Sequence, residues 1–279
     1  MSDSRGDKNA VFGGTPQHAK TSMQDQFGFE IPTELIPLPS RGITYPTESS
    51  MHMKEAIEIK AMTAKEEDIL TSRALIKNGK VISTLLNSCI LNENFDAKHM
   101  LSGDRNALLV GVRVTGYGAD YRIDVSCPEC GEKSTQDFNL TELPIKRMGI
   151  EPLRPGENLF EFVLPMSKIP VVFRYMTGAD EEDIVMTNAR RKKSGMSVEN
   201  NVTQRLKYSI VQVGEHKDAG KIAAFVQQMP ARDSRALRKY MESNEPGIDM
   251  KSWMTCHSCH ENSEVSLPMG PSFFWPESE

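Results

Sequence analysis

The chain has 279 residues, of which 38% are hydrophobic and 25% charged, and its formal net charge at pH 7 is −5. This composition fits a soluble globular protein with two ordinary domains or one duplicated domain, and it argues against a dedicated nucleic-acid binder, which is usually basic. No segment approaches the roughly 18 consecutive apolar residues that a membrane helix needs. Residues 1–26 lack the apolar stretch of a signal peptide, so we expect residence in a reducing cytoplasm and no membrane association.

The first 50 residues divide into two segments of different composition. Residues 1–27 are mostly polar and predict a flexible arm, either a loose terminus or a segment that becomes ordered on a partner. In residues 28–50, apolar side chains alternate with four prolines, which disfavour a helix and favour extended backbone. We therefore predict an extended Pro-rich strap that lies on its own domain or on a neighbouring protein.

A first structural unit is predicted over residues 51–143. Alternating apolar residues at 57–61 indicate a strand, and Thr63 followed by Glu66 is a capping box that begins a helix. Apolar residues at helical spacing predict two further helices, the second of which ends at a Gly-Tyr-Gly sequence. Two short alternating segments then predict a β-hairpin at the end of the unit.

A second unit over residues 161–279 follows a linker at 144–160 and repeats this order. A strand pattern again precedes a capping threonine, Thr177, and helical segments again lead to a hairpin. The offset between matching positions grows from 114 to 129 along the chain, which indicates loop insertions in the second copy. Agreement in order across several blocks predicts an α+β fold built from an internally duplicated strand–helices–β-hairpin unit.

Each predicted hairpin carries two cysteines separated by two residues. Cys127 and Cys130 belong to the first pair, and a shift of 129 residues places them on Cys256 and Cys259. Paired CxxC motifs in a reducing compartment favour metal binding over disulfides. A structural zinc site needs four ligands, and each motif supplies two. We therefore predict two zinc-ribbon-like knuckles joined at one metal site, with one structural zinc per chain.

Alternatives to this site remain open from the sequence alone. Iron also binds four thiolates, and reduced thiols without metal, a disulfide or a redox pair fit the same motifs. His257 and His260 are competing candidate ligands. His260 also stands where the first knuckle has Gly131, which leaves the turn geometry of the second knuckle open.

No catalytic constellation is found. The chain has no Gly-rich phosphate loop, nucleophile elbow or metalloprotease motif, and a four-thiolate site leaves no open position for chemistry. Cys89 lies on an apolar helical face and is predicted to be a buried core thiol. The basic run at 190–193 is interpreted as a helix C-terminus, with contact to an acid-rich protein or nucleic acid as the functional alternative. We predict a protein that is not an enzyme and has no small-molecule substrate.

An ordered series of motifs resembles a known family over about residues 30–276. The motifs are Leu38-Pro39-Ser40-Arg41-Gly42, Tyr45-Pro46, the segment from Met62 to Arg73, Gly103 to Leu108, Thr115 to Gly118, Cys127 to Gly131, and Phe273-Phe274-Trp275-Pro276. Together they resemble the baseplate hub and baseplate assembly proteins of contractile-tailed bacteriophages. The resemblance implies a structural or assembly role in a tail baseplate, with other phage baseplate and tail proteins as partners. It also implies a location in the host cytoplasm during assembly and in the virion tail afterwards.

Two apolar segments are candidate docking surfaces for those partners. The residues are Leu35, Ile36, Leu38 and Tyr45 in the strap, and Phe273, Phe274 and Trp275 near the C-terminus. Aromatic anchors of this kind often dominate interface energy. The competing hypothesis is a zinc-ribbon regulator associated with nucleic acid, against which the acidic net charge and the lack of interleaved basic and aromatic residues argue.

Overall fold

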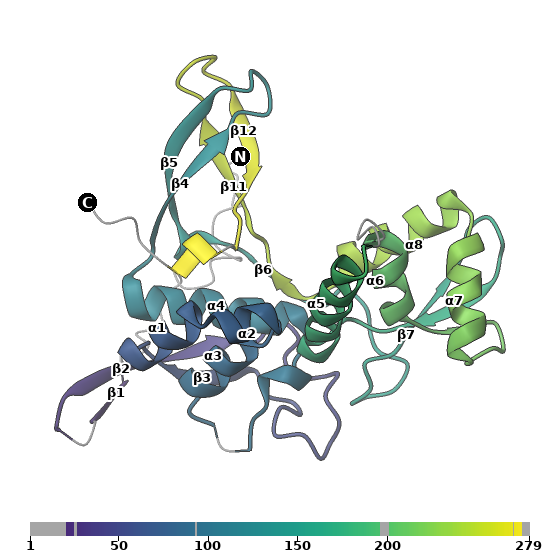
Figure 1. The fold of residues 1–279 in the computed structure, drawn as a ribbon, viewed down its shortest axis with the longest axis horizontal. Helices are drawn as coiled ribbons and strands as arrows, with labels where there is room; N and C mark the ends of the chain where they lie inside the picture. Colours follow the sequence, from purple (N-terminus) through teal and green to yellow (C-terminus); the bar gives the residue numbers. More distant parts are fainter. Residues whose placement is uncertain (1–20, 25–26, 93, 196–200, 270, 275–279) are drawn as a thin grey trace, which may run out of the picture.

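The computed structural model describes residues 21–24, 27–92, 94–195, 201–269 and 271–274. Most of the predicted arm and Trp275 lie outside these residues. The described residues form eight α-helices and several small antiparallel sheets (Figure 1). This mixed architecture agrees with the predicted α+β class.

The first lobe is built on a three-stranded sheet in the order β1 (Thr21–Gln24), β2 (Glu30–Pro37) and β3 (Ala56–Lys60). Its inner face packs on α4 (Ser102–Tyr117), where Gly111 has no Cβ and so admits the Ile36 side chain. A Cβ at this glycine would lie 2.6 Å from Cδ1 of Ile36. The lobe also contains α1 (Ala64–Thr71), α2 (Arg73–Lys77), α3 (Val81–Cys89) and the short helix η1 (Ala97–His99).

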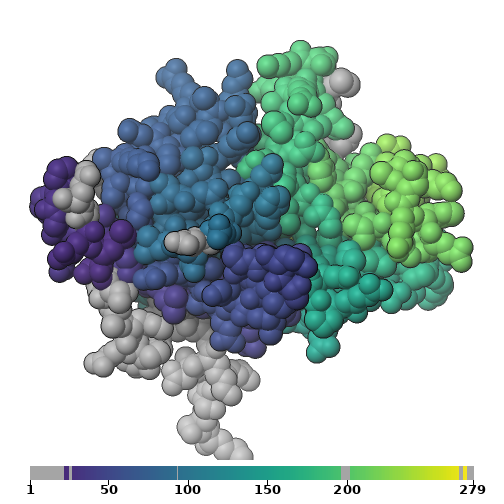
Figure 2. Space-filling model, turned by 90° about the horizontal axis from the view of Figure 1, so that it is seen from below, coloured from purple at the N-terminus to yellow at the C-terminus, as the bar shows by residue number. Residues whose placement is uncertain are grey.

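The second lobe repeats the pairing of a small sheet with helices. Its sheet has the order β7 (Phe160–Val163), β8 (Pro170–Phe173) and β9 (Ile210–Val213). Figure 2 shows the two lobes in direct contact, and the backbone bridge between Leu101 and Thr177 joins them. The helices of this lobe are α5 (Gly178–Lys193), α6 (Asn201–Ser209), α7 (Ala219–Gln228) and α8 (Ala231–Asn244).

Two β-hairpins rise side by side from this helical body (Figure 1). One consists of β4 (Asp120–Ser126) and β5 (Lys133–Asn139), and the other of β11 (Lys251–Thr255) and β12 (Asn262–Ser266). The short strands β6 (Ile145–Lys146) and β10 (Gly247–Ile248) pair with each other near their bases. Segments more than 100 residues apart in sequence are thus held together at the bases of the hairpins.

A buried arginine links the base of the first hairpin to the end of the chain. Arg113 on α4 is 1% exposed, and its guanidinium donates to the carbonyls of Gly118, Asp120 and Phe273. These three hydrogen bonds satisfy the buried charge and fix the short helix η3 (Pro271–Phe274) against β4. The ring of Phe273 packs edge-on against Tyr121, with their centroids 5.3 Å apart. A further short helix, η2 (Leu140–Glu142), follows β5.

Candidate metal centre

The two hairpin tips have the same backbone geometry. Each CxxC motif opens a six-residue turn between its strands, at 127–132 in one hairpin and 256–261 in the other. In the first, the Cys127 amide donates to the Glu132 carbonyl over 2.8 Å, and the amide of residue 131 donates back to the Cys127 carbonyl over 2.9 Å. In the second, the Cys256 amide donates to the Glu261 carbonyl over 3.0 Å, and the amide of residue 260 donates to the Cys256 carbonyl over 2.9 Å.

The fifth residue of the turn is left-handed in both tips. Gly131 has φ of 76° and His260 has φ of 60°. Glycine adopts this region without steric cost, and histidine is among the residues that tolerate it better than most. The absence of glycine at 260 therefore does not alter the turn, and the question left open by the sequence is answered by the backbone.

The four sulfur atoms converge between the tips. The sulfurs of Cys127 and Cys259 are 3.8 Å apart, those of Cys130 and Cys256 are 3.7 Å apart, and all four lie within 4.8 Å of one another. Each of these close pairs joins one hairpin to the other. Zinc–sulfur bonds of about 2.3 Å in a tetrahedral site place sulfurs about 3.8 Å apart. The donor set and its spacing therefore fit one tetrahedral metal ion.

The environment of the cysteines favours thiolate at one of them. Cys127 and Cys256 are buried, Cys259 is half-buried and Cys130 is exposed. The backbone N–H groups of Cys259 and Ser258 donate toward the Cys256 sulfur and lower its pKa to about 7. Thiolate is the form that binds metal, so these amides prepare Cys256 as a ligand.

Neither histidine belongs to the sulfur cluster. His257 and His260 are exposed, and the group of potential ligands found among the described residues contains the four cysteines alone. Cys89 is not part of the sulfur cluster. It is fully buried on α3, and burial raises the pKa of its thiol to about 12. It is a core residue, as its apolar helical face predicted.

The candidate docking residues have different positions. Leu35 is 49% exposed, whereas the strap residues Ile36, Leu38 and Tyr45 are buried in the first lobe. Phe273 and Phe274 are buried as well. Five of these side chains therefore contact their own chain, and of the described members only Leu35 presents a large apolar surface to solvent.

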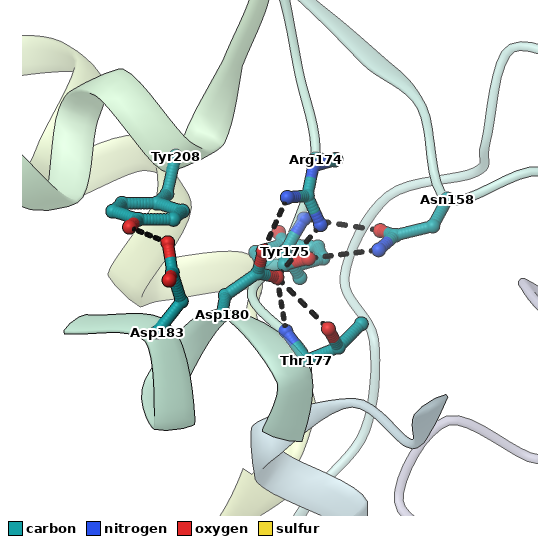
Figure 3. Close-up of polar contacts among 7 residues, drawn as sticks. All are labelled: Asn158, Arg174, Tyr175, Thr177, Asp180, Asp183 and Tyr208. Atoms are coloured by element: carbon teal, nitrogen blue, oxygen red, sulfur yellow. Dashed lines mark hydrogen bonds and ion pairs between the residues drawn. The ribbon is translucent and has the colours of Figure 1, made fainter. Parts of the chain in front are cut away.

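Matched helix caps, which the sequence indicated in part, position the helices behind the hairpins. In the first lobe Glu66 accepts hydrogen bonds from Thr63 and Lys60. In the second, Asp180 accepts from Thr177 and forms a two-bond ion pair with Arg174, at 2.6 and 2.8 Å (Figure 3). Both sets have the spacing basic-x-x-Thr-x-x-acid. A single offset of 114 residues aligns all three positions of the two sets.

Two buried aspartates hold the helices that lead into the hairpins. Asp104, in the first turn of α4, accepts from the amide and hydroxyl of Ser40 and from the hydroxyl of Tyr45. Asp233, in the first turn of α8, accepts from the amides of Met166 and Ser167. The two aspartates are 129 residues apart, the same offset as the cysteine motifs, but their partners are far away in the chain and no local signal indicates them.

Comparison with known proteins identifies the family. A family model described as T4 bacteriophage base plate protein matches residues 43–275. The chain belongs to this family of phage baseplate proteins. No curated protein and no solved structure matches the chain. None of the described helices is long and apolar enough to cross a membrane.

Family membership supports a structural role in the virion tail, together with other phage tail proteins, and no enzymatic activity is suggested by it. The cysteine cluster adds a feature with its own physical consequence. Two hairpins that bury little surface are joined at their tips by a set of ligands able to hold a metal ion.

Proposed function

We propose that this protein is a non-enzymatic structural or assembly component of a phage tail baseplate, held rigid by one structural zinc ion between its two hairpins. The observation that carries the proposal is the convergence of four sulfurs from knuckles 126 to 132 residues apart, in a member of a baseplate family. A metal ion bound by these four sulfurs would cross-link the hairpin of the first lobe to the hairpin of the second through coordination bonds. Its binding energy contributes directly to folding.

We infer that the two lobes arose by internal duplication, with repeat units at 51–143 and 161–279. The matched caps, the matched buried aspartates and the matched knuckles support this history, since each occurs in the same order in both units. The consequence for function is a pseudo-symmetric body in which each copy provides half of the ligand set. Zinc is the metal proposed because four thiolates in a closed tetrahedral set are typical of structural zinc.

Docking on neighbouring tail proteins is proposed through the strap and the C-terminal segment. Among the candidate docking residues that the structure describes, Leu35 on β2 is the exposed one. Buried Ile36, Leu38 and Tyr45 then act indirectly, by fixing the sheet that presents it, and buried Phe273 and Phe274 hold the C-terminal segment on the chain. Trp275, which lies outside the described residues, remains a proposed anchor. Assembly in the host cytoplasm precedes incorporation in the tail on this proposal.

The competing function is a zinc-ribbon regulator associated with nucleic acid. Membership of a baseplate family favours the structural role over it. The acidic net charge of the chain points the same way.

The test is native mass spectrometry of the full chain, before and after acid denaturation. The expected result is one zinc per chain, lost on unfolding, and no iron. A metal-free folded chain with four free thiols would overturn the zinc staple. In parallel, phage carrying Cys127→Ser should assemble few baseplates, and normal assembly in that variant would contradict the structural role of the site.

A further inference from the structure

The distribution of charge along the chain is uneven. Residues 190–239 contain 12 Lys and Arg but only 4 Asp and Glu, a net of +8, whereas the whole chain has a net of −5. The rest of the molecule therefore carries −13. The basic residues lie on the end of α5, on α6, on the turn before α7, on α7 and on α8, and all of them are exposed or half-exposed. None takes part in the salt bridges found among the described residues.

On α8 the basic residues form a stripe. Arg232, Arg235 and Lys239 recur at intervals of three and four residues, which places them on one face of the helix, and Arg238 lies beside them. Asp233 of this helix is fully buried on another face, where it accepts hydrogen bonds from the backbone amides of the loop at 166–167. Like charges at this spacing repel one another, so the stripe costs stability unless an anionic partner covers it.

A cavity of about 290 Å³ lies at the inner side of this stripe, between α6, α8 and the first residue of α4. Arg205 of α6 and Arg238 of α8 line it, together with Tyr175 and Ser102. The hydroxyl oxygens of Tyr175 and Ser102 are buried, so the cavity reaches these residues but not their hydroxyl oxygens. The two guanidinium side chains, which are exposed, are therefore the donors that a ligand in the cavity can reach.

Two carboxyl groups also line the cavity. Burial raises the pKa of Glu245, and the nearby charges of Glu181 and Glu242 raise it further, against the effect of Lys146 and Arg205. Its carboxyl therefore carries less negative charge than an exposed glutamate at the same pH. Glu242 is exposed at the rim. The two guanidiniums therefore face one exposed carboxylate and one carboxyl group whose pKa is raised.

We propose that the α6–α8 surface binds an acidic segment of a neighbouring protein, with one carboxylate of that segment entering the cavity between Arg205 and Arg238. The guanidiniums would supply charge-assisted hydrogen bonds to that carboxylate. This inference deepens the proposed docking function and rests on it. A protein segment suits the site better than nucleic acid, because residues 190–239 expose no large aromatic side chain for base stacking and the rest of the chain repels an extended polyanion.

The experiment is fluorescence anisotropy of a labelled hexaglutamate peptide titrated with the full chain at low salt. We expect binding that Arg205→Ala combined with Arg238→Ala weakens at least about tenfold. The matched control is Arg73→Ala combined with Lys77→Ala, which removes the same charge from exposed positions on α2 and should change binding by about twofold at most. Equal affinity in the two double variants would overturn the proposal.

A second variant separates the cavity from general surface charge. Arg232→Ala combined with Arg235→Ala removes the same charge from the α8 stripe outside the cavity, so it should weaken binding less than Arg205→Ala combined with Arg238→Ala does. Equal weakening by the two pairs would overturn the role of the cavity. Two further arms test other ligands: a hexathymidylate that binds as tightly as the peptide would assign the surface to nucleic acid, and displacement of the peptide by inorganic phosphate at about 1 mM would assign the cavity to a free anion.

The same samples are analysed for zinc by native mass spectrometry. If the chain binds its metal but not the peptide, the proposed binding of an acidic segment is contradicted and the zinc site is not. A chain that binds the peptide without metal would instead contradict the zinc staple, since the two measurements report on different parts of the molecule.

Discussion

The two lobes share their internal supports and differ at their surfaces. In both, a strand (β2 or β7) is followed by a Leu-Pro sequence and a loop that donates to a buried aspartate, by Ser40 in the first lobe and by Met166 and Ser167 in the second. Both also use a threonine and an acid to begin the next helix, and both end in the same knuckle. The basic stretch at 190–239 has no counterpart in the first lobe. Buried polar contacts and metal ligands thus preserve a geometry while exposed helices acquire a different charge.

The aspartate pair shows how one role is filled by two environments. Burial raises the pKa of Asp104 despite the donors Ser40 and Tyr45. For Asp233 the pKa is lowered, because the hydrogen bonds from Met166 and Ser167 outweigh its burial. A raised pKa favours folding at low pH and that contribution is lost as pH rises, whereas a lowered pKa contributes above the ordinary value and is lost as pH falls. The matched residues therefore respond to pH in opposite directions.

The largest expected effect tests whether the two knuckles are equal partners. Cys127→Ser and Cys256→Ser each remove one ligand from the shared set, so each should abolish metal binding and destabilise the chain by more than about 4 kcal/mol. Urea unfolding and metal analysis provide the measurement. Cys89→Ala is the control: it removes a buried thiol outside the cluster and should cost about 1 kcal/mol with the metal retained. A large difference between the two serine variants would show that one knuckle dominates.

A smaller effect is expected at the buried aspartates. Asp104→Ala leaves Ser40 and the Tyr45 hydroxyl without an acceptor in a fully buried site and should cost about 3–5 kcal/mol. Asp233→Ala loses two amide bonds and should cost about 2–3 kcal/mol. Denaturant midpoints at neutral pH provide both values. The reverse order would mean that the loop at 166–167 depends more on its aspartate than the strap does.

The helix caps provide a pH test. Donors from Ser88, Thr63 and Lys60 outweigh burial and lower the pKa of Glu66 to about 2. The stability that it contributes is present above its ordinary pKa of about 4.5 and is lost as pH falls toward 2, so Glu66→Gln should cost about 2–3 kcal/mol at pH 7 and almost nothing at pH 2. Asp180→Asn should follow the same trend, since Arg174 and Thr177 lower the pKa of Asp180. A cost for Glu66→Gln that does not vary with pH would contradict this assignment.

Local patterns were sufficient to predict much of the fold. Alternation, the threonine caps and the glycine helix stops depend on neighbours within a few residues, and the strands, helices and CxxC hairpins occur where these patterns lie. The partners of Asp104 lie 59 and 64 residues away, and the cavity beside Tyr175 joins residues of α4, α6 and α8, which no local pattern encodes. Burial of Phe273 and Phe274 was missed for a related reason: an apolar C-terminal segment has the same composition whether it packs on its own chain or on a partner.

The smallest effect concerns one of the three positions at which the knuckles differ in sequence. Gly131 and His260 have the same left-handed backbone, which costs a residue with a Cβ about 1–2 kcal/mol, although histidine tolerates this region better than most residues. His260→Gly should therefore raise stability, by about 0.5–1 kcal/mol once the greater chain entropy of glycine is included. Gly131→Ala should lower it by about 1 kcal/mol, and this cost is purely conformational because nothing lies within 4 Å of the added Cβ. Thermal unfolding of the metal-loaded chain measures both changes. If His260→Gly were destabilising, the His260 imidazole would have to contribute to the metal site directly. The ligand set would then include a group besides the four cysteines, and the two knuckles would not contribute equally.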